Sequence, residues 1–150
     1  METATQYLPD LFAENLPSTD QIQTISNYVH CGEANRLAFI QKLEQNLPQT
    51  GQKAALSCGI GMSLLGRFKE SIEKLEKAKD CLEKFFFLAR AQRKIRQFDK
   101  ALASLDKCLE FGADPFKISL KKVALYRSSL NYEAAHKELK KNANYLVSRR

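Results

Sequence analysis

A block of four residues recurs three times along this chain, and it limits the fold more than any other feature. Each block reads aromatic, small, large apolar, small, in steps of three, four and three residues, and successive blocks begin 30 and 34 residues apart. The blocks are Phe68, Ser71, Leu75 and Ala78; Phe98, Ala101, Leu105 and Cys108; and Tyr132, Ala135, Leu139 and Asn142. Such steps place all four residues on one helix face. A period near 34 residues predicts helix–turn–helix repeats, which bury their apolar faces only by stacking.

Length and composition favour one helical domain. The 150 residues, of which 44% are hydrophobic, are sufficient for a packed core. Proline (4) and glycine (6) are scarce, and no stretch alternates as a strand would. We therefore expect an all-α domain over residues 18–150, preceded by an N-terminal tail over residues 1–17.

The tail carries apolar residues that would be unusual in a linker: Tyr7, Leu8, Leu11, Phe12 and Leu16. The favoured interpretation is a short segment that packs on the first helices. Two alternatives stay open, a segment lying in the groove of its own or a neighbouring molecule, and disorder.

Capping and helix-breaking residues divide the domain into eight expected helices. Ser18 and Gln21 fit a capping box, Gly32 and Gly66 follow helix ends, and Asp114-Pro115 fits the start of a helix. The expected ranges are about 19–30, 33–47, 52–65, 68–80, 82–95, 98–110, 115–129 and 132–147. Paired in order, they give a degenerate repeat at 18–49, which lacks the block, and repeats at 52–81, 82–115 and 116–148.

Cysteine usage and the N-terminus indicate a cytoplasmic protein without a metal site. The four cysteines form no Cys-x-x-Cys pair, and there are only two histidines, so zinc-site spacing is absent. The N-terminus has no basic region before an apolar run, and no apolar run is long enough to span a membrane. We expect reduced thiols and no cofactor.

Charge is divided unevenly along the chain. Residues 1–51 hold two bases and six acids, a net charge of −4, whereas residues 52–150 hold 22 bases and 11 acids, a net charge of +11. The basic part coincides with the repeats.

The recurring blocks resemble the second helix of the tetratricopeptide repeat, and the match covers about residues 52–142. The preceding helices resemble its first helix, with small residues at Gly59 and Ala89. Positions that depart from the family pattern are Gln92, Lys122, Val123 and Asn142. The first repeat is four residues short, so the turn around Asp80–Cys81 must be tight. The resemblance implies a right-handed superhelix of antiparallel helix pairs, in which Gly59 and Ala89 let the two helices of a repeat cross closely.

The resemblance also implies a concave groove lined by the first helix of each repeat. The ten residues carried over as partner-binding are Leu56, Ile60, Phe86, Arg90, Arg93, Lys94, Lys117, Leu120, Lys121 and Arg127. The predicted surface begins apolar and becomes basic, and arginine suits carboxylates. The hypothesis is a groove for an acidic segment with apolar anchors; the alternative is that these charges are solvated faces of a helical protein.

One subtype of the family binds the acidic tails of heat-shock chaperones through a clamp of Lys and Asn. This chain has Leu56, Ile60 and Phe87 where that clamp needs Lys, Asn and a second Asn. We therefore expect no binding of those tails.

Other functions are less favoured. His30 and Cys31 are neighbours at a helix end, and His136 stands alone, so nothing in the sequence indicates an enzyme. Nucleic-acid binding is the main rival, because of the basic repeats, but most aromatics there fall on repeat positions. A chaperone of the type III secretion class, holding an apolar effector segment, is a further alternative. The favoured interpretation is a non-catalytic adaptor or scaffold; dimerisation through the N-terminal helices stays open.

Overall fold

The computed structural model describes the backbone of residues 8–148 and the side chains of residues 8–144. Over that range the chain is all-helical, as predicted, with eight helices and no strand. The helices are α1 (Thr19–His30), α2 (Glu33–Asn46), α3 (Gln52–Leu64), α4 (Phe68–Glu76), α5 (Leu82–Lys94), α6 (Phe98–Glu110), α7 (Pro115–Ser128) and α8 (Tyr132–Ser148). Most ends lie within a residue or two of the expected ones, and the exception is α4, which ends four residues early.

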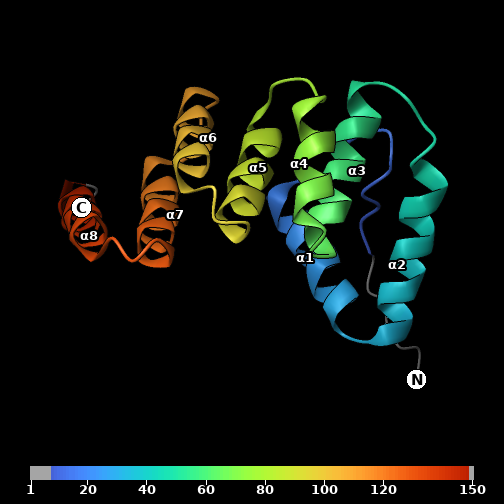
Figure 1. The fold of residues 1–150 in the computed structure, drawn as a ribbon, viewed down its shortest axis with the longest axis horizontal. Helices are drawn as coiled ribbons and strands as arrows, with labels where there is room; N and C mark the ends of the chain where they lie inside the picture. Colours follow the sequence, from blue (N-terminus) through green and yellow to red (C-terminus); the bar gives the residue numbers. More distant parts are fainter. Residues whose placement is uncertain (1–7, 149–150) are drawn as a thin grey trace.

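The helices form an elongated row in which each packs mainly on its neighbours in sequence. Helices α2 and α8 lie at opposite ends of the row (Figure 1). Helix α1 packs on α2 and shares a buried cluster with α3 and α5. The core follows this order. One cluster of buried apolar residues joins α1, α2, α3, α4 and α5, and a second joins α5, α6 and α7. Packing of adjacent pairs is therefore present, as a stacked-repeat architecture requires.

The part of the N-terminal tail that the structure describes packs on the first helices, as the favoured interpretation held. Leu11 is 1% exposed and belongs to the core cluster of α1–α5. The ring of Phe12 lies 6.2 Å from that of Phe39, and Asp10 forms a 2.9 Å ion pair with Lys42 of α2. Tyr7 lies outside the described residues.

Small residues let α3 and α4 cross closely. A Cβ at Gly59 would lie 2.7 Å from the side chain of Leu75, and Leu75 is fully buried. Ser71 donates a 2.6 Å hydrogen bond to the carbonyl oxygen of Gly59. The equivalent pair in the next repeat, Ala89 and Ala101, is also buried. The small residues of the repeated block therefore lie where helices meet.

The same turn closes three successive helix pairs. Gly66, Arg96 and Leu130 each adopt a positive φ, of 80°, 66° and 62°. After each of them the next residue's N–H bonds to a carbonyl five residues back, as in a Schellman motif. The spacing of 30 and 34 residues equals that of the blocks. Gly32 does not fit the series, because its φ is 179°, so the degenerate repeat turns differently.

We expect Leu130→Gly to raise the free energy of unfolding by about 0.5–1 kcal/mol, measured by urea denaturation. Leu130 is 67% exposed, so little packing is lost, while the left-handed backbone that burdens a leucine costs glycine nothing. Gly66→Ala is the matched control in the first of these turns, and it should lower stability. A destabilised Leu130→Gly variant would contradict this account of the turn.

Helix α4 ends early because a buried lysine holds the following turn. Lys84 is 7% exposed, and its Nζ donates to the carbonyl oxygen of Ala78 at 2.9 Å and to Asp80 Oδ1 at 2.8 Å. Ala78 itself is buried. The hydrogen bond from Lys84 lowers the pKa of Asp80. The ion pair of Asp80 with Lys84 therefore contributes stability above the ordinary carboxyl pKa. That contribution is lost as the pH falls through the lowered pKa of Asp80.

We expect Lys84→Met to lower the free energy of unfolding by about 2 kcal/mol, because a charged donor to a carbonyl in a buried setting is removed. The check is urea denaturation at neutral pH. Asp80→Asn is the control, since it removes the ion pair but keeps the bond to Ala78, and its loss should be smaller because Asp80 is exposed. Equal losses would show that the ion pair, not the carbonyl bond, holds the turn.

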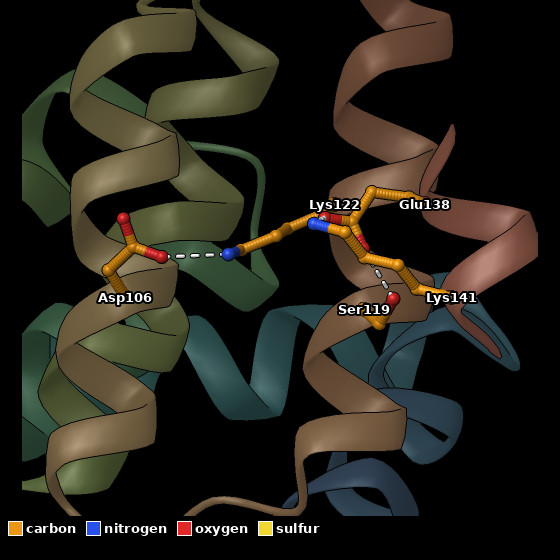
Figure 2. Close-up of polar contacts among 5 residues, drawn as sticks. All are labelled: Asp106, Ser119, Lys122, Glu138 and Lys141. Carbon is orange, nitrogen blue, oxygen red and sulfur yellow. Dashed lines mark hydrogen bonds and ion pairs between the residues drawn. The ribbon is translucent and has the colours of Figure 1, made fainter. Parts of the chain in front are cut away.

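Two of the four residues that depart from the repeat pattern, Lys122 and Gln92, form polar bridges between helices. Lys122 of α7 makes a 2.8 Å ion pair with Asp106 of α6, and Ser119 of α7 donates a 2.6 Å hydrogen bond to Glu138 of α8 (Figure 2). The buried side chains of Gln92 on α5 and Ser104 on α6 also hydrogen bond, at 2.7 Å. Buried polar groups that are paired in this way cost little and fix which faces meet.

Candidate partner-binding groove

A groove of about 800 Å³ lies between α1, α5 and α7. The α5 side presents Leu82, Phe86, Phe87 and Arg90, and the α7 side presents Lys117, Ile118, Leu120, Lys121 and Ala124. The opposite side is α1, and the groove is completed by Leu64 of α3 and the turn at 112–114. Apolar and cationic side chains therefore share one surface. This volume suits a segment of another chain or a small ligand.

A smaller pocket of about 130 Å³ opens at the α5–α7 side of the groove. Phe86, Arg90, Lys121 and Ala124 line both cavities, so the two adjoin. The rest of the pocket is Ala89, Arg93, Leu105 and Leu125. Ala89, Leu105 and Leu125 belong to the buried cluster of α5, α6 and α7. The pocket thus combines buried apolar residues with three cationic side chains, and we call it the cationic pocket.

Three cations gather at the rim of the cationic pocket: Arg90, Arg93 and Lys121. None of them forms an ion pair with a carboxylate among the described residues. Partial burial lowers the pKa of Arg90, and Arg93 lowers it further. Partial burial also lowers the pKa of Lys121, with added repulsion from Arg93 and Arg90. The fold therefore holds three like charges close together, and an anion bound there would relieve their repulsion.

Neighbouring side chains orient two of these cations. Ser128 donates a 2.9 Å hydrogen bond to the carbonyl oxygen of Ala124 and accepts one from Arg93 Nη1 at 3.4 Å, across from α5 to α7. Lys121 Nζ lies 5.1 Å from the ring centroid of Phe86, a cation–π contact. Phe86 is held in turn by an edge-on contact with the buried ring of Phe87. The cationic pocket is therefore largely preformed.

We expect Lys121→Met to raise the free energy of unfolding by a few tenths of a kcal/mol, because it removes one of the three like charges and keeps the stem against Phe86. The pKa of Lys121 is lower in the folded state, so the wild type gains stability as the pH rises toward the ordinary lysine value of 10.5. The advantage of the variant should therefore be largest near neutral pH and vanish above that value. Urea denaturation between neutral and alkaline pH checks this, and an advantage that grows with pH would contradict it.

The structure brings six of the ten carried-over residues together. Phe86, Arg90, Arg93, Lys117, Leu120 and Lys121 line the groove or its cationic pocket. Lys94 and Arg127 are exposed and line neither cavity. Leu56 is half-buried and packs against the core cluster of α1–α5.

Ile60 requires a correction. It is 0% exposed, in one cluster with Ile22, Ile25 and Val29 of α1, so it cannot line a groove. The reason is that the face of α3 that the resemblance assigned to the partner belongs to a buried cluster shared with α1. The apolar beginning of the predicted groove is thus already filled by the chain itself.

Sequence reasoning missed the wall that α1 contributes. Thr19, Asp20, Ile22, Gln23 and Ser26 all line the groove. The available signal was the assignment of residues 18–49 as a degenerate repeat, because the rule that first helices line the groove applies to its first helix as well. Among the described residues, no group of three or more His, Cys, Asp or Glu is placed to hold a metal ion. None of the described helices is long and apolar enough to cross a membrane.

Comparison of the chain with protein-family models, with curated proteins and with solved structures found no match in any of the three. The resemblance to the tetratricopeptide repeat is therefore carried by the residues of this chain alone.

Proposed function

We propose that this chain is a non-catalytic protein-interaction module of the tetratricopeptide type, a right-handed superhelix of antiparallel helix pairs that acts as a cytoplasmic adaptor or scaffold. Its groove binds an acidic segment of a partner protein that also carries apolar anchors. The observation that carries this proposal is the gathering of Arg90, Arg93 and Lys121 without a carboxylate partner beside an apolar surface. Repulsion among these cations, of which Arg90 and Arg93 are half-buried and Lys121 is exposed, costs stability, and an anionic ligand would offset that cost.

The groove contains binding positions for both the carboxylates and the apolar anchors of such a segment. Carboxylates would accept hydrogen bonds from the two guanidinium groups, which favour planar, bidentate contacts. Apolar anchors would contact Leu82, Phe86 and Leu120, of which Leu120 is 44% exposed. Apolar and cationic side chains on the same surface fix the register of a bound segment. The charges chiefly determine its specificity and association rate.

The proposal is tested by site-specific crosslinking in nuclease-treated lysate of the source cells. A photoreactive residue replaces Leu120, which lines the groove, or Leu109, an exposed leucine outside it. We expect the Leu120 probe, and not the Leu109 probe, to capture a protein whose crosslinked segment is rich in Asp or Glu. Capture from Leu109 alone, or an apolar segment without acids at Leu120, would contradict the proposal; the latter would favour the secretion-chaperone alternative.

Nucleic-acid binding remains the rival that the basic residues favour. It predicts that nuclease removes the captured material, and that affinity falls steeply with salt because many phosphate contacts release counterions. A protein segment held partly by apolar contacts should retain more of its affinity at high salt. Titrations at two salt concentrations with the captured segment therefore separate the two classes.

A further inference from the structure

We infer that the cationic pocket binds a phosphate monoester carried on the partner segment, so that phosphorylation of the partner controls its capture. This inference rests on the proposed function and adds the chemical class of the acidic group. The argument depends on how many cations meet in the pocket, on what they can donate, and on what else lies there.

The number of cations exceeds what a carboxylate can neutralise. Arg90, Arg93 and Lys121 each contribute a positive charge to the same pocket of about 130 Å³. A carboxylate carries one negative charge, whereas a phosphate monoester carries nearly two at neutral pH. Because the three cations repel one another and no described carboxylate forms an ion pair with them, the anion with the larger charge gains more from entering.

The geometry of the donors also favours a phosphate. Arg90 and Arg93 approach from α5, one helical turn apart, and Lys121 approaches from α7 on the other side. Donors that converge from two helices can address different oxygens of a tetrahedral group, whereas the two oxygens of a carboxylate lie in one plane. Arg93 is held by Ser128, and Lys121 by Phe86, so less freedom is lost on binding.

The surroundings indicate that the phosphate is attached to a protein segment. The cationic pocket shares Phe86, Arg90, Lys121 and Ala124 with the larger groove, where Leu82, Ile118 and Leu120 offer apolar contacts on either side. A free phosphate ion would use none of these contacts. A nucleic acid would place phosphates all along the groove, but its α1 side presents Thr19, Asp20, Gln23 and Ser26 and no cation.

The test uses three short peptides of alanine and leucine that differ only in a central phosphoserine, glutamate or serine. Fluorescence anisotropy measures their binding to the wild type, to Arg93→Gln and to Arg127→Gln, a control of equal net charge whose side chain lies outside both cavities. Inorganic phosphate and a single-stranded oligonucleotide serve as competitors. We expect the phosphoserine peptide to bind the wild type about tenfold or more tightly than the glutamate peptide. Arg93→Gln should remove that difference, and Arg127→Gln should leave it.

Each other outcome overturns the inference. Equal binding of the phosphoserine and glutamate peptides would exclude a preference for phosphate and would leave the proposed acidic groove standing. Equal weakening by Arg93→Gln and Arg127→Gln would show a diffuse basic surface. Oligonucleotide that competes far better than inorganic phosphate, with binding lost in Arg93→Gln, would assign the pocket to nucleic acid. No binding of any peptide, combined with a segment crosslinked to Leu120 that lacks phosphate, would overturn the inference while the proposed function survives.

Discussion

Reversing two charges, by Arg90→Glu and Lys121→Glu together, is expected to weaken binding of the acidic partner segment by at least about 100-fold. Each substitution removes an attraction and introduces a repulsion, and breaking a contact of the half-buried Arg90 costs about 2–5 kcal/mol, whereas the exposed Lys121 contributes less. Since about 1.4 kcal/mol corresponds to a factor of ten, the low end of that range is a loss of about 30-fold for one contact, and the loss of both contacts exceeds about 100-fold. The measurement is a calorimetric titration with the segment identified by crosslinking from Leu120.

The control for this variant is Lys94→Glu with Arg127→Glu. It has the same net charge and changes residues of the same two helices, but both side chains are exposed and line neither cavity. Its effect on binding should be small and should shrink with added salt, because the field of exposed charges is screened over about 10 Å at 0.1 M. A control that loses as much affinity as the groove variant would show that overall charge, and not the cationic pocket, attracts the partner.

Folding of the groove variant is not expected to suffer, which makes the binding result interpretable. The wild type holds three cations together in the cationic pocket, and the variant replaces two of them with acids that can pair with Arg93. Circular dichroism and urea denaturation would confirm that its helices and stability are retained. Binding sites commonly lower the folding stability of a protein in order to keep groups that the ligand needs.

The helices could be predicted closely from sequence because their signals are local. A capping box at Ser18 and a proline after Asp114 mark helix starts, and both are present in the structure. The end of α4 could not be predicted in the same way. It depends on Lys84 reaching back to Ala78 and Asp80, and nothing in the type of residue at 84 shows that its ammonium is buried.

The candidate site was harder to predict, because a residue lines the groove only where no other helix covers its side chain. Ile60 and Phe86 both fall on first helices, and periodicity treats them alike. Ile60 is fully buried in the cluster that α3 shares with α1, whereas Phe86 remains at the groove. A single helix face does not reveal its neighbours. Of the six cationic residues of α5 and α7 that the sequence placed at the groove, four therefore lie there, but the sequence also placed the buried Ile60 there.

Truncating the large apolar residue of each repeated block is expected to show how far the repeats are equivalent. Leu75, Leu105 and Leu139 occupy the same block position and are 0%, 4% and 47% exposed. We expect Leu75→Ala and Leu105→Ala to lower the free energy of unfolding by about 2–5 kcal/mol each, and Leu139→Ala by about 1 kcal/mol or less. Urea denaturation followed by circular dichroism measures all three. A loss at Leu139 as large as at Leu105 would contradict its exposed position.

Among the three, Leu75→Ala should cost the most, because its neighbour cannot fill the space. Leu75 faces Gly59, which has no side chain, so the cavity left by the truncation stays open on that side. Gly59→Ala distinguishes this from a general loss of packing. In the wild type the new Cβ would lie 2.7 Å from Leu75 and should destabilise by about 1–3 kcal/mol. In the Leu75→Ala background the side-chain clash is gone and the 3.2 Å approach to the backbone nitrogen of residue 75 remains, so Gly59→Ala should cost about 1 kcal/mol less than in the wild type. Additive effects of the two substitutions would show that the close approach of α3 and α4 does not depend on this pair.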